Sequence, residues 1–249
     1  MRVKLTIIGC GDAFCAGGRL QSAYLLEAGG EPLLVDCGMT TLMGLERMGV
    51  SLDSIPRIVI SHLHGDHFGG LVMCLMHAAL VTRRPTPIDV YGPPGTEART
   101  MATMELLYPG MAAKLGSLQV RYHDVHAGQA LQLGKTKMIA FTVDHPSGAP
   151  SYALRFETGG KVFAYSGDSQ WTEAIVDVGH KADLYLLECY KFEGTPVFHL
   201  SWVMIQQHLA RIAAKRIVLT HMSNDMLARQ GEVKDPSVAF AEDGAVYEI

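Results

Sequence analysis

Short apolar runs, separated by turns of glycine, proline and polar residues, follow one another along this chain. Runs of four to eight residues that are rich in β-branched side chains indicate strands. Two pairs of such runs are joined by Gly-Gly turns, which predict β-hairpins. The expected strands cover residues 3–8, 22–27, 32–35, 57–60, 88–91, 120–122, 129–133, 138–143, 152–157, 161–165, 184–187, 217–220, 238–241 and 246–249.

Longer segments with helical spacing lie between these strands. They predict helices over residues 40–48, 71–81, 96–108, 171–178 and 201–214, and Ser201 is the expected N-cap of the last one. Strands that alternate with helices, with hairpins in both halves, predict a layered α/β protein with mixed sheets. Because the chain contains neither a linker nor a repeat, we expect one domain over residues 1–249.

Composition narrows the class of protein. The chain has 249 residues, of which 48% are hydrophobic, and this is enough for a large core. Its net charge of -4 and its low charged content of 18% disfavour binding to long nucleic acids. Five widely spaced cysteines without a C-x-x-C pair are typical of a reducing compartment. With neither a signal peptide nor a long apolar run, the expectation is a cytoplasmic protein that does not enter a membrane.

The strongest chemical signal is the segment His62-Leu63-His64-Gly65-Asp66-His67. It places three imidazoles and one carboxylate directly after the predicted strand at residues 57–60. Imidazole is a good ligand for zinc, iron and nickel, whereas a carboxylate also suits harder ions. For a motif of only six residues, this pattern is specific enough to predict a function. We interpret it as half of a two-metal hydrolytic centre.

More ligands must then lie downstream, and three candidates follow predicted strands. His145 comes after residues 138–143, Asp168 after 161–165, and His221 after 217–220. Open α/β folds place their functional sites at such strand ends. We therefore expect these side chains to meet the first cluster.

This ordered set, H-x-H-x-D-H followed by a lone His, S-G-D and T-H-x-S, resembles the metallo-β-lactamase superfamily. The resemblance implies a four-layer αββα sandwich with two mixed β-sheets. It also implies two divalent metal ions, for which zinc fits best, with manganese or iron as alternatives. The first ion would be held by His62, His64 and His145; the second would be held by Asp66, His67 and His221, with Asp168 as the bridge.

Within the superfamily the chain is most similar to the ribonuclease Z-like branch. The segment Ala182–Glu188 resembles its A-D-L-L-I-x-E sequence, His199-Leu200-Ser201 resembles G-H-S-T, and residues 241–244 resemble A-x-D-G. This likeness implies that His199 faces the metals from a neighbouring loop. A homodimer would also fit the family.

Two departures from that branch argue against tRNA as a substrate. The tRNA-processing enzymes carry a long arm between the positions that match His145 and Asp168, and here this interval holds only one predicted hairpin. Their basic P-x-K-x-R-N loop is replaced by residues 17–22, which keep only Arg19. We therefore expect a small anionic substrate.

The implied mechanism is hydrolysis of a phosphodiester by a metal-bound hydroxide. Asp66 would orient this nucleophile and accept its proton, and His199 would donate a proton to the leaving oxygen or stabilise the developing charge. Asp36 is a candidate to hydrogen-bond a ligand imidazole. For Glu188 two roles remain open, participation in proton transfer and a structural ion pair. Two alternatives remain: hydrolysis of another ester, such as an aryl sulfate or a lactone, and a non-catalytic member of the fold that binds a ligand.

Overall fold

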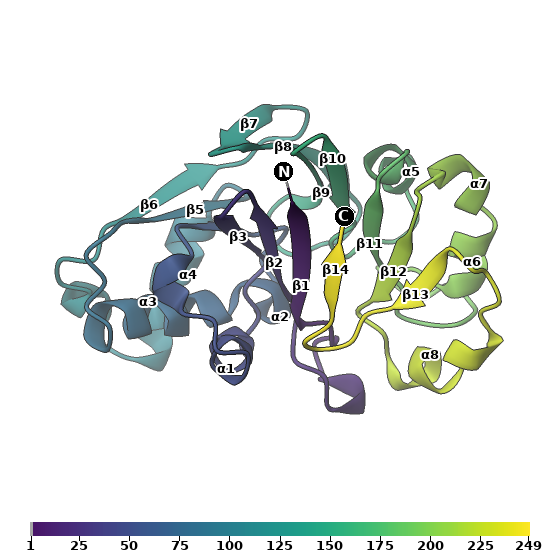
Figure 1. The fold of residues 1–249 in the computed structure, drawn as a ribbon. Coiled ribbons are helices and arrows are strands. Elements are labelled where there is room, and N and C mark those ends of the chain that lie inside the picture. The colour runs from purple at the N-terminus through teal and green to yellow at the C-terminus, as the bar shows by residue number, and fades with distance from the viewer. Residues whose placement is uncertain (1) are drawn as a thin grey trace.

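The computed structural model describes residues 2–249, which form two seven-stranded mixed β-sheets (Figure 1). The first sheet has the order β14-β1-β2-β3-β4-β5-β6, and the second has the order β13-β12-β11-β10-β9-β8-β7. Strands of the first sheet are β1 (Val3–Gly9), β2 (Ala23–Ala28), β3 (Glu31–Val35), β4 (Arg57–Val59), β5 (Ile88–Gly92), β6 (Val120–Asp124) and β14 (Val246–Glu248).

The second sheet is built mostly from the second half of the chain. Its strands are β7 (Ala130–Leu133), β8 (Thr136–Val143), β9 (Ser151–Thr158), β10 (Lys161–Tyr165), β11 (Leu184–Glu188), β12 (Ile217–Thr220) and β13 (Val238–Phe240). Both predicted hairpins are present, as the antiparallel pairs β2–β3 and β9–β10. Parallel pairing follows in each sheet, from β3 to β6 and from β10 to β13.

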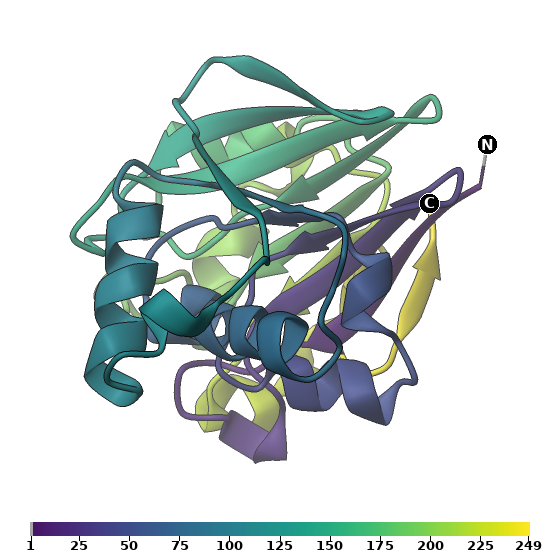
Figure 2. The same cartoon turned by 90° about the vertical axis from the view of Figure 1, so that its left-hand side faces the viewer.

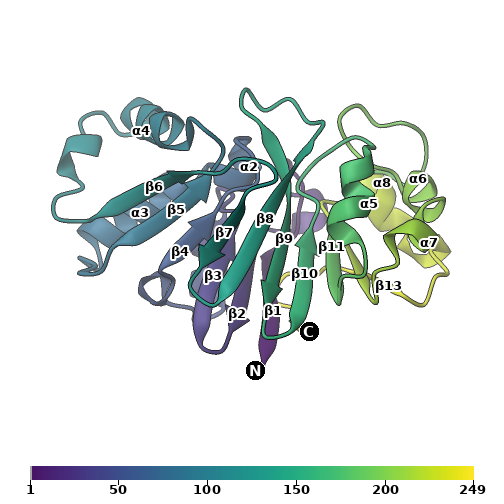
Figure 3. The same ribbon diagram turned by 90° about the horizontal axis from the view of Figure 1, so that it is seen from above.

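Helices cover the outer face of each sheet (Figures 1 and 3). The helices of the first half are α1 (Thr41–Arg47), α2 (Gly65–Phe68), α3 (Gly70–Leu80) and α4 (Thr96–Leu107), and α1, α3 and α4 lie in front of the first sheet in Figure 2. Those of the second half are α5 (Glu173–Gly179), α6 (Trp202–Gln206), α7 (Leu209–Ile212) and α8 (Asn224–Ala228). Short 3-10 turns occupy Ala16–Gly18, Leu52–Ser54, Ala112–Lys114 and Gln230–Glu232. The predicted four-layer αββα sandwich is confirmed.

Three apolar layers, one between the two sheets and one beneath the helices of each half, explain why the strands are apolar on both faces. Leu5 and Leu26 of the first sheet and Phe163 of the second are buried between the two sheets. Alternate residues such as Ile8 and Leu25 point the other way, toward the helices. Since each sheet is covered on both sides, its strands form nearly continuous apolar runs instead of an alternating pattern.

The prediction of one continuous helix over residues 201–214 is wrong. It is divided into α6 and α7, with Gln207 and His208 between them. The ring of Trp171 stacks on His208 with a centroid distance of 3.9 Å, so a tertiary contact forms where the helix is interrupted. Ser201 is the N-cap residue of α6, as expected, but its buried hydroxyl donates to the Gly194 carbonyl at 2.8 Å and makes no side-chain cap of the helix.

Residues 2–249 contain no helix that is both long and apolar enough to cross a membrane. The predicted site residues come together because several strands end at the same side of the molecule. His62 follows β4, His145 follows β8, Asp168 follows β10 and His221 follows β12. The carboxyl ends of these strands therefore bring side chains from both sheets to one place.

Candidate metal centre

The seven predicted ligands form two groups of side chains that could each hold a metal ion. The first group is His62, His64 and His145, and the second is Asp66, His67, Asp168 and His221. Within each group, one nitrogen or oxygen atom of every residue lies within 4.8 Å of those of the others. The structure thus divides these residues as the sequence analysis did, and it draws each group from both halves of the chain.

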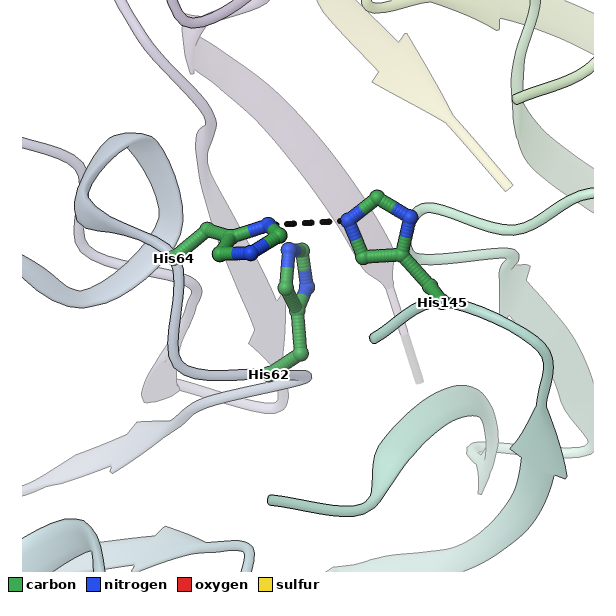
Figure 4. Close-up of side chains that lie close together, drawn as sticks. All are labelled: His62, His64 and His145. Atoms are coloured by element: carbon green, nitrogen blue, oxygen red, sulfur yellow. Dashed lines mark hydrogen bonds between the residues drawn. The ribbon is translucent and has the colours of Figure 1, made fainter. Parts of the chain in front are cut away.

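The first group is a ring of three imidazoles (Figure 4). His64 Nδ1 and His145 Nε2 are 2.9 Å apart, and the buried His62 ring lies edge-on to both. The other nitrogen of His145, Nδ1, donates to the Phe198 carbonyl at 2.9 Å, which leaves a lone pair on Nε2. Burial lowers the pKa of His145 to about 4, so this imidazole is neutral at physiological pH.

In the second group, one carboxylate oxygen lies between the two groups. Asp168 Oδ2 is 3.2 Å from Nε2 of both His67 and His221. The same oxygen is 4.0 Å from His62 Nε2 and 3.9 Å from His145 Nε2. This is the position that a carboxylate needs in order to contact ions in both groups.

Buried polar atoms without partners test whether a metal fits here. His62 Nε2, His67 Nε2 and Asp168 Oδ1 make no hydrogen bond with any of the described residues. Buried polar atoms in folded proteins are nearly always paired, and neighbouring unpaired donor atoms of this kind are what a metal ion would bind. Five imidazoles and two carboxylates are a donor set that suits zinc and related divalent ions. The residues present therefore fit a metal centre.

Electrostatics links the acidic and basic members of the second group. Burial acts to lower the pKa of His67, but the nearby carboxylates of Asp168 and Asp66 raise it well above the usual value. Burial likewise acts to raise the pKa of Asp66, and the charge of His67 reverses this and lowers it. Each charged form thus stabilises the other, and a cation would take over this role for the carboxylates.

The Asp36 carboxylate makes several hydrogen bonds next to the second group. Its Oδ2 lies 2.7 Å from His67 Nδ1 and accepts from the hydroxyls of Ser61 and Tyr165 at 2.9 and 2.8 Å. The hydrogen bond that we expected between Asp36 and a ligand imidazole is therefore present. It orients the His67 ring so that Nε2 faces Asp168. Sequence reasoning missed Ser61 and Tyr165.

His199 lies beside both groups, on the loop after β11. Its Nδ1 is 3.2 Å from the carboxylate of Glu188 and 3.9 Å from Asp168 Oδ2. The Tyr190 ring stacks on its imidazole with a centroid distance of 4.8 Å. Burial acts to lower the pKa of His199, but the nearby Glu188 carboxylate outweighs this effect, so the pKa is raised above its usual value. Glu188 is fully buried and also accepts from the Leu200 amide, so it positions His199.

A cavity of about 310 Å³ opens next to His199 and His221. It is lined by Phe14 from the loop after β1 and by Tyr190 and Val197 from the loop after β11. A larger hollow of about 620 Å³ lies over Lys4, Glu27 and Met48, and none of the candidate site residues lines it.

Fold and site together define a metallo-hydrolase of the metallo-β-lactamase fold with ribonuclease Z-like relatives. The family model described as "Anti-Pycsar protein Apyc1" matches residues 3–247, and the chain belongs to this family.

Several known proteins resemble the chain over nearly its whole length. "Probable metallo-hydrolase YhfI" of Bacillus subtilis is 26% identical and covers 99% of this chain and 100% of its own. The crystal structure of YhfI superposes with a TM-score of 0.81 at 24% identity over 99% of both chains. "Ribonuclease Z" of Mycobacterium avium is 27% identical over 92% of this chain and 89% of its own. The short form of human tRNase Z has a TM-score of 0.78 and 27% identity over 98% of both chains.

Proposed function

We propose that this protein is a dinuclear metal-dependent phosphodiesterase that acts on a small anionic phosphodiester. The observation that carries the proposal is the position of Asp168 Oδ2 between two groups of candidate metal ligands, in which the buried Nε2 atoms of His62 and His67 have no hydrogen-bond partner. The names of the ribonuclease Z relatives support phosphodiester chemistry.

Each of the two groups of candidate ligands would hold one metal ion. His62, His64 and His145 would hold one ion, and the second would be held by Asp66, His67 and His221, with Asp168 shared between them. Zinc suits this donor set best, and manganese and iron are alternatives. Such ions supply Lewis-acid activation of water at neutral pH.

Two side chains would move protons. Asp66 would orient the attacking water and accept its proton. His199 has Nδ1 engaged by Glu188, so Nε2 is the nitrogen that would donate to the leaving oxygen. The raised pKa of His199 keeps a larger share of this imidazole protonated, which suits a general acid.

The charge and shape of the site support a small anionic substrate. Two divalent cations outweigh the carboxylates of Asp66 and Asp168, so the loaded site would attract an anion. The interval between His145 and Asp168 is filled by β9 and β10 and leaves no room for an arm that grips tRNA. The cavity beside His199 has the volume for a small molecule.

We also propose a reducing cytoplasmic location and a homodimer. The first is supported by five cysteines, none of which forms a disulfide within residues 2–249. The second is supported by the family resemblance.

The test is hydrolysis of bis(p-nitrophenyl) phosphate beside p-nitrophenyl sulfate, phosphate and acetate, with metal content measured on the same samples. We expect diester turnover with two ions bound, and the loss of turnover together with metal in His64→Ala. His126→Ala is the matched control, because His126 is exposed and lies outside the donor groups. This variant should keep both properties.

Other outcomes would redirect the proposal. Turnover of the sulfate or acetate alone would favour an aryl sulfatase or a lactonase. Two bound ions without any turnover would favour a non-catalytic protein that binds a ligand. A protein that binds no zinc or manganese would contradict the proposal.

A further inference from the structure

Arg99 connects two loops that carry the first group of ligands. It projects from α4, and its Nη1 donates to the carbonyls of Leu63 at 3.1 Å and Ser147 at 2.6 Å. Its Nη2 donates to the Gly148 carbonyl at 3.4 Å. Leu63 lies between His62 and His64, and Ser147 lies two residues after His145. One side chain thus reaches both segments without touching a ligand imidazole.

The two segments belong to different sheets. Leu63 follows β4 of the first sheet, whereas Ser147 and Gly148 follow β8 of the second. The planar guanidinium holds its N–H groups in a fixed fork, so it sets the separation of two carbonyls more strictly than an ammonium can. The Gly148 backbone, at φ +76°, approaches so closely that an added Cβ would lie 2.7 Å from Arg99 Nη2.

We propose that Arg99 is a positioning residue for one of the two metal ions, the one held by His62, His64 and His145. By fixing the spacing of the two loops, it brings the three imidazoles into the ring seen in Figure 4. This inference rests on the two-metal centre proposed above.

The second ion should be insensitive to Arg99, because other contacts hold its ligands. Asp36 fixes His67 at 2.7 Å, and the His221 amide donates to the Cys10 carbonyl at 3.1 Å. None of these contacts involves α4. The inference therefore predicts a selective effect on one site, which general loosening of the fold would not produce.

The experiment is a titration of metal-free protein with Co²⁺ against a chromophoric chelator, which resolves the two binding steps. His64→Ala and His221→Ala identify which step belongs to which group. In Arg99→Gln and Arg99→Lys, the step lost in His64→Ala should weaken about 10-fold, the lower end of the range for outer-shell substitutions at metal sites. The step lost in His221→Ala should keep its affinity.

Arg155 provides a matched control. Its Nη1 also donates to two carbonyls, those of Val178 at 2.9 Å and His180 at 3.1 Å, but neither lies in a loop that carries a ligand. Arg155→Gln and Arg155→Lys should leave both binding steps unchanged. Unfolding by denaturant is measured on all four variants, so that changes in stability are seen separately from changes in metal affinity.

Two binding results would overturn the inference. Equal weakening of both steps would make Arg99 a general structural residue, and unchanged steps would give it no role at the site. If Arg99→Gln does not fold, Arg99→Lys decides, because it keeps the charge and the aliphatic stem. If neither folds while the Arg155 variants do, Arg99 serves folding. A wild-type protein that binds fewer than two ions would contradict the proposed function itself, which the Arg99 variants alone cannot do.

Discussion

At the scale of single residues, the partners of His199 allow two roles. Its Nδ1 pairs with the buried carboxylate of Glu188 at 3.2 Å, which keeps Nε2 available for proton transfer. The same residue lies close enough to His145 and Asp168 to share a metal ion with them. A substitution at this position separates the proposed proton donor from a metal ligand.

Replacing His199 by Gln should lower kcat on the order of 100-fold or more while the metal content stays at the wild-type level, because a general acid contributes on that scale. The measurement is kcat on bis(p-nitrophenyl) phosphate together with metal per chain. Loss of an ion in this variant would instead make His199 a ligand.

That the seven candidate ligands meet at one place could be predicted from the sequence, because they occur in a dense motif and at strand ends. Tyr165 and Ser61, which hold Asp36, could not be separated from ordinary core and turn residues, since one ends an apolar strand and the other opens a turn. Nothing in the sequence indicated a role for Arg99 at the site, because a lone arginine on a helix is usually solvated. Their roles depend on contacts between segments distant in the sequence.

At the scale of elements, the start of α3 is packed directly on the loop after β3. A Cβ at Gly70 would lie 2.0 Å from the Gly38 carbonyl oxygen. That loop carries Asp36, and the helix follows the segment with Asp66 and His67. Close approach of these two backbones therefore helps to place the second group of ligands.

Substituting Gly70 by Ala should lower the free energy of unfolding by about 1–3 kcal/mol, because the clash is with backbone and forces a shift. In an open helical position the same change would stabilise by about 0.5–1 kcal/mol. The control is Gly231→Ala, where no atom lies within 4 Å of the added Cβ. Equal denaturation midpoints for Gly70→Ala and the wild type would contradict this argument.

Strands and long helices were predicted well, since their apolar runs are local signals. The short helices α2 and α8, of four and five residues, were missed because so few residues carry no readable periodicity. The break between α6 and α7 was missed for another reason: Trp171, which stacks on His208, comes from a segment far away in the sequence.

At the scale of the whole molecule, the candidate metal centre lies where the two sheets meet. His62 and His64 follow a strand of the first sheet, and His145 follows a strand of the second. Bound ions would thus link the two halves of the sandwich. The αββα arrangement was predictable from the order of motifs and strands, whereas the single domain over residues 1–249 stays a prediction.

Removal of metal should therefore lower the thermal stability of the protein. Ions that bind only the folded state stabilise it by about 2.7 kcal/mol at a free concentration 100 times their Kd. We expect a chelator to lower the Tm and added zinc to restore it, as measured by calorimetry. In His64→Ala the response should be smaller. A Tm that is the same with and without chelator would show that the ions do not contribute to stability.

The spread of the ligands along the chain also has a consequence for biosynthesis. The ribosome makes His62, His64, Asp66 and His67 early, but His221 follows only after more than 150 further residues. At ordinary rates of translation this delay is roughly ten to thirty seconds. During that time the nascent chain exposes three imidazoles and a carboxylate whose final partners do not yet exist, so the complete centre could only be loaded with metal after His221 has been made.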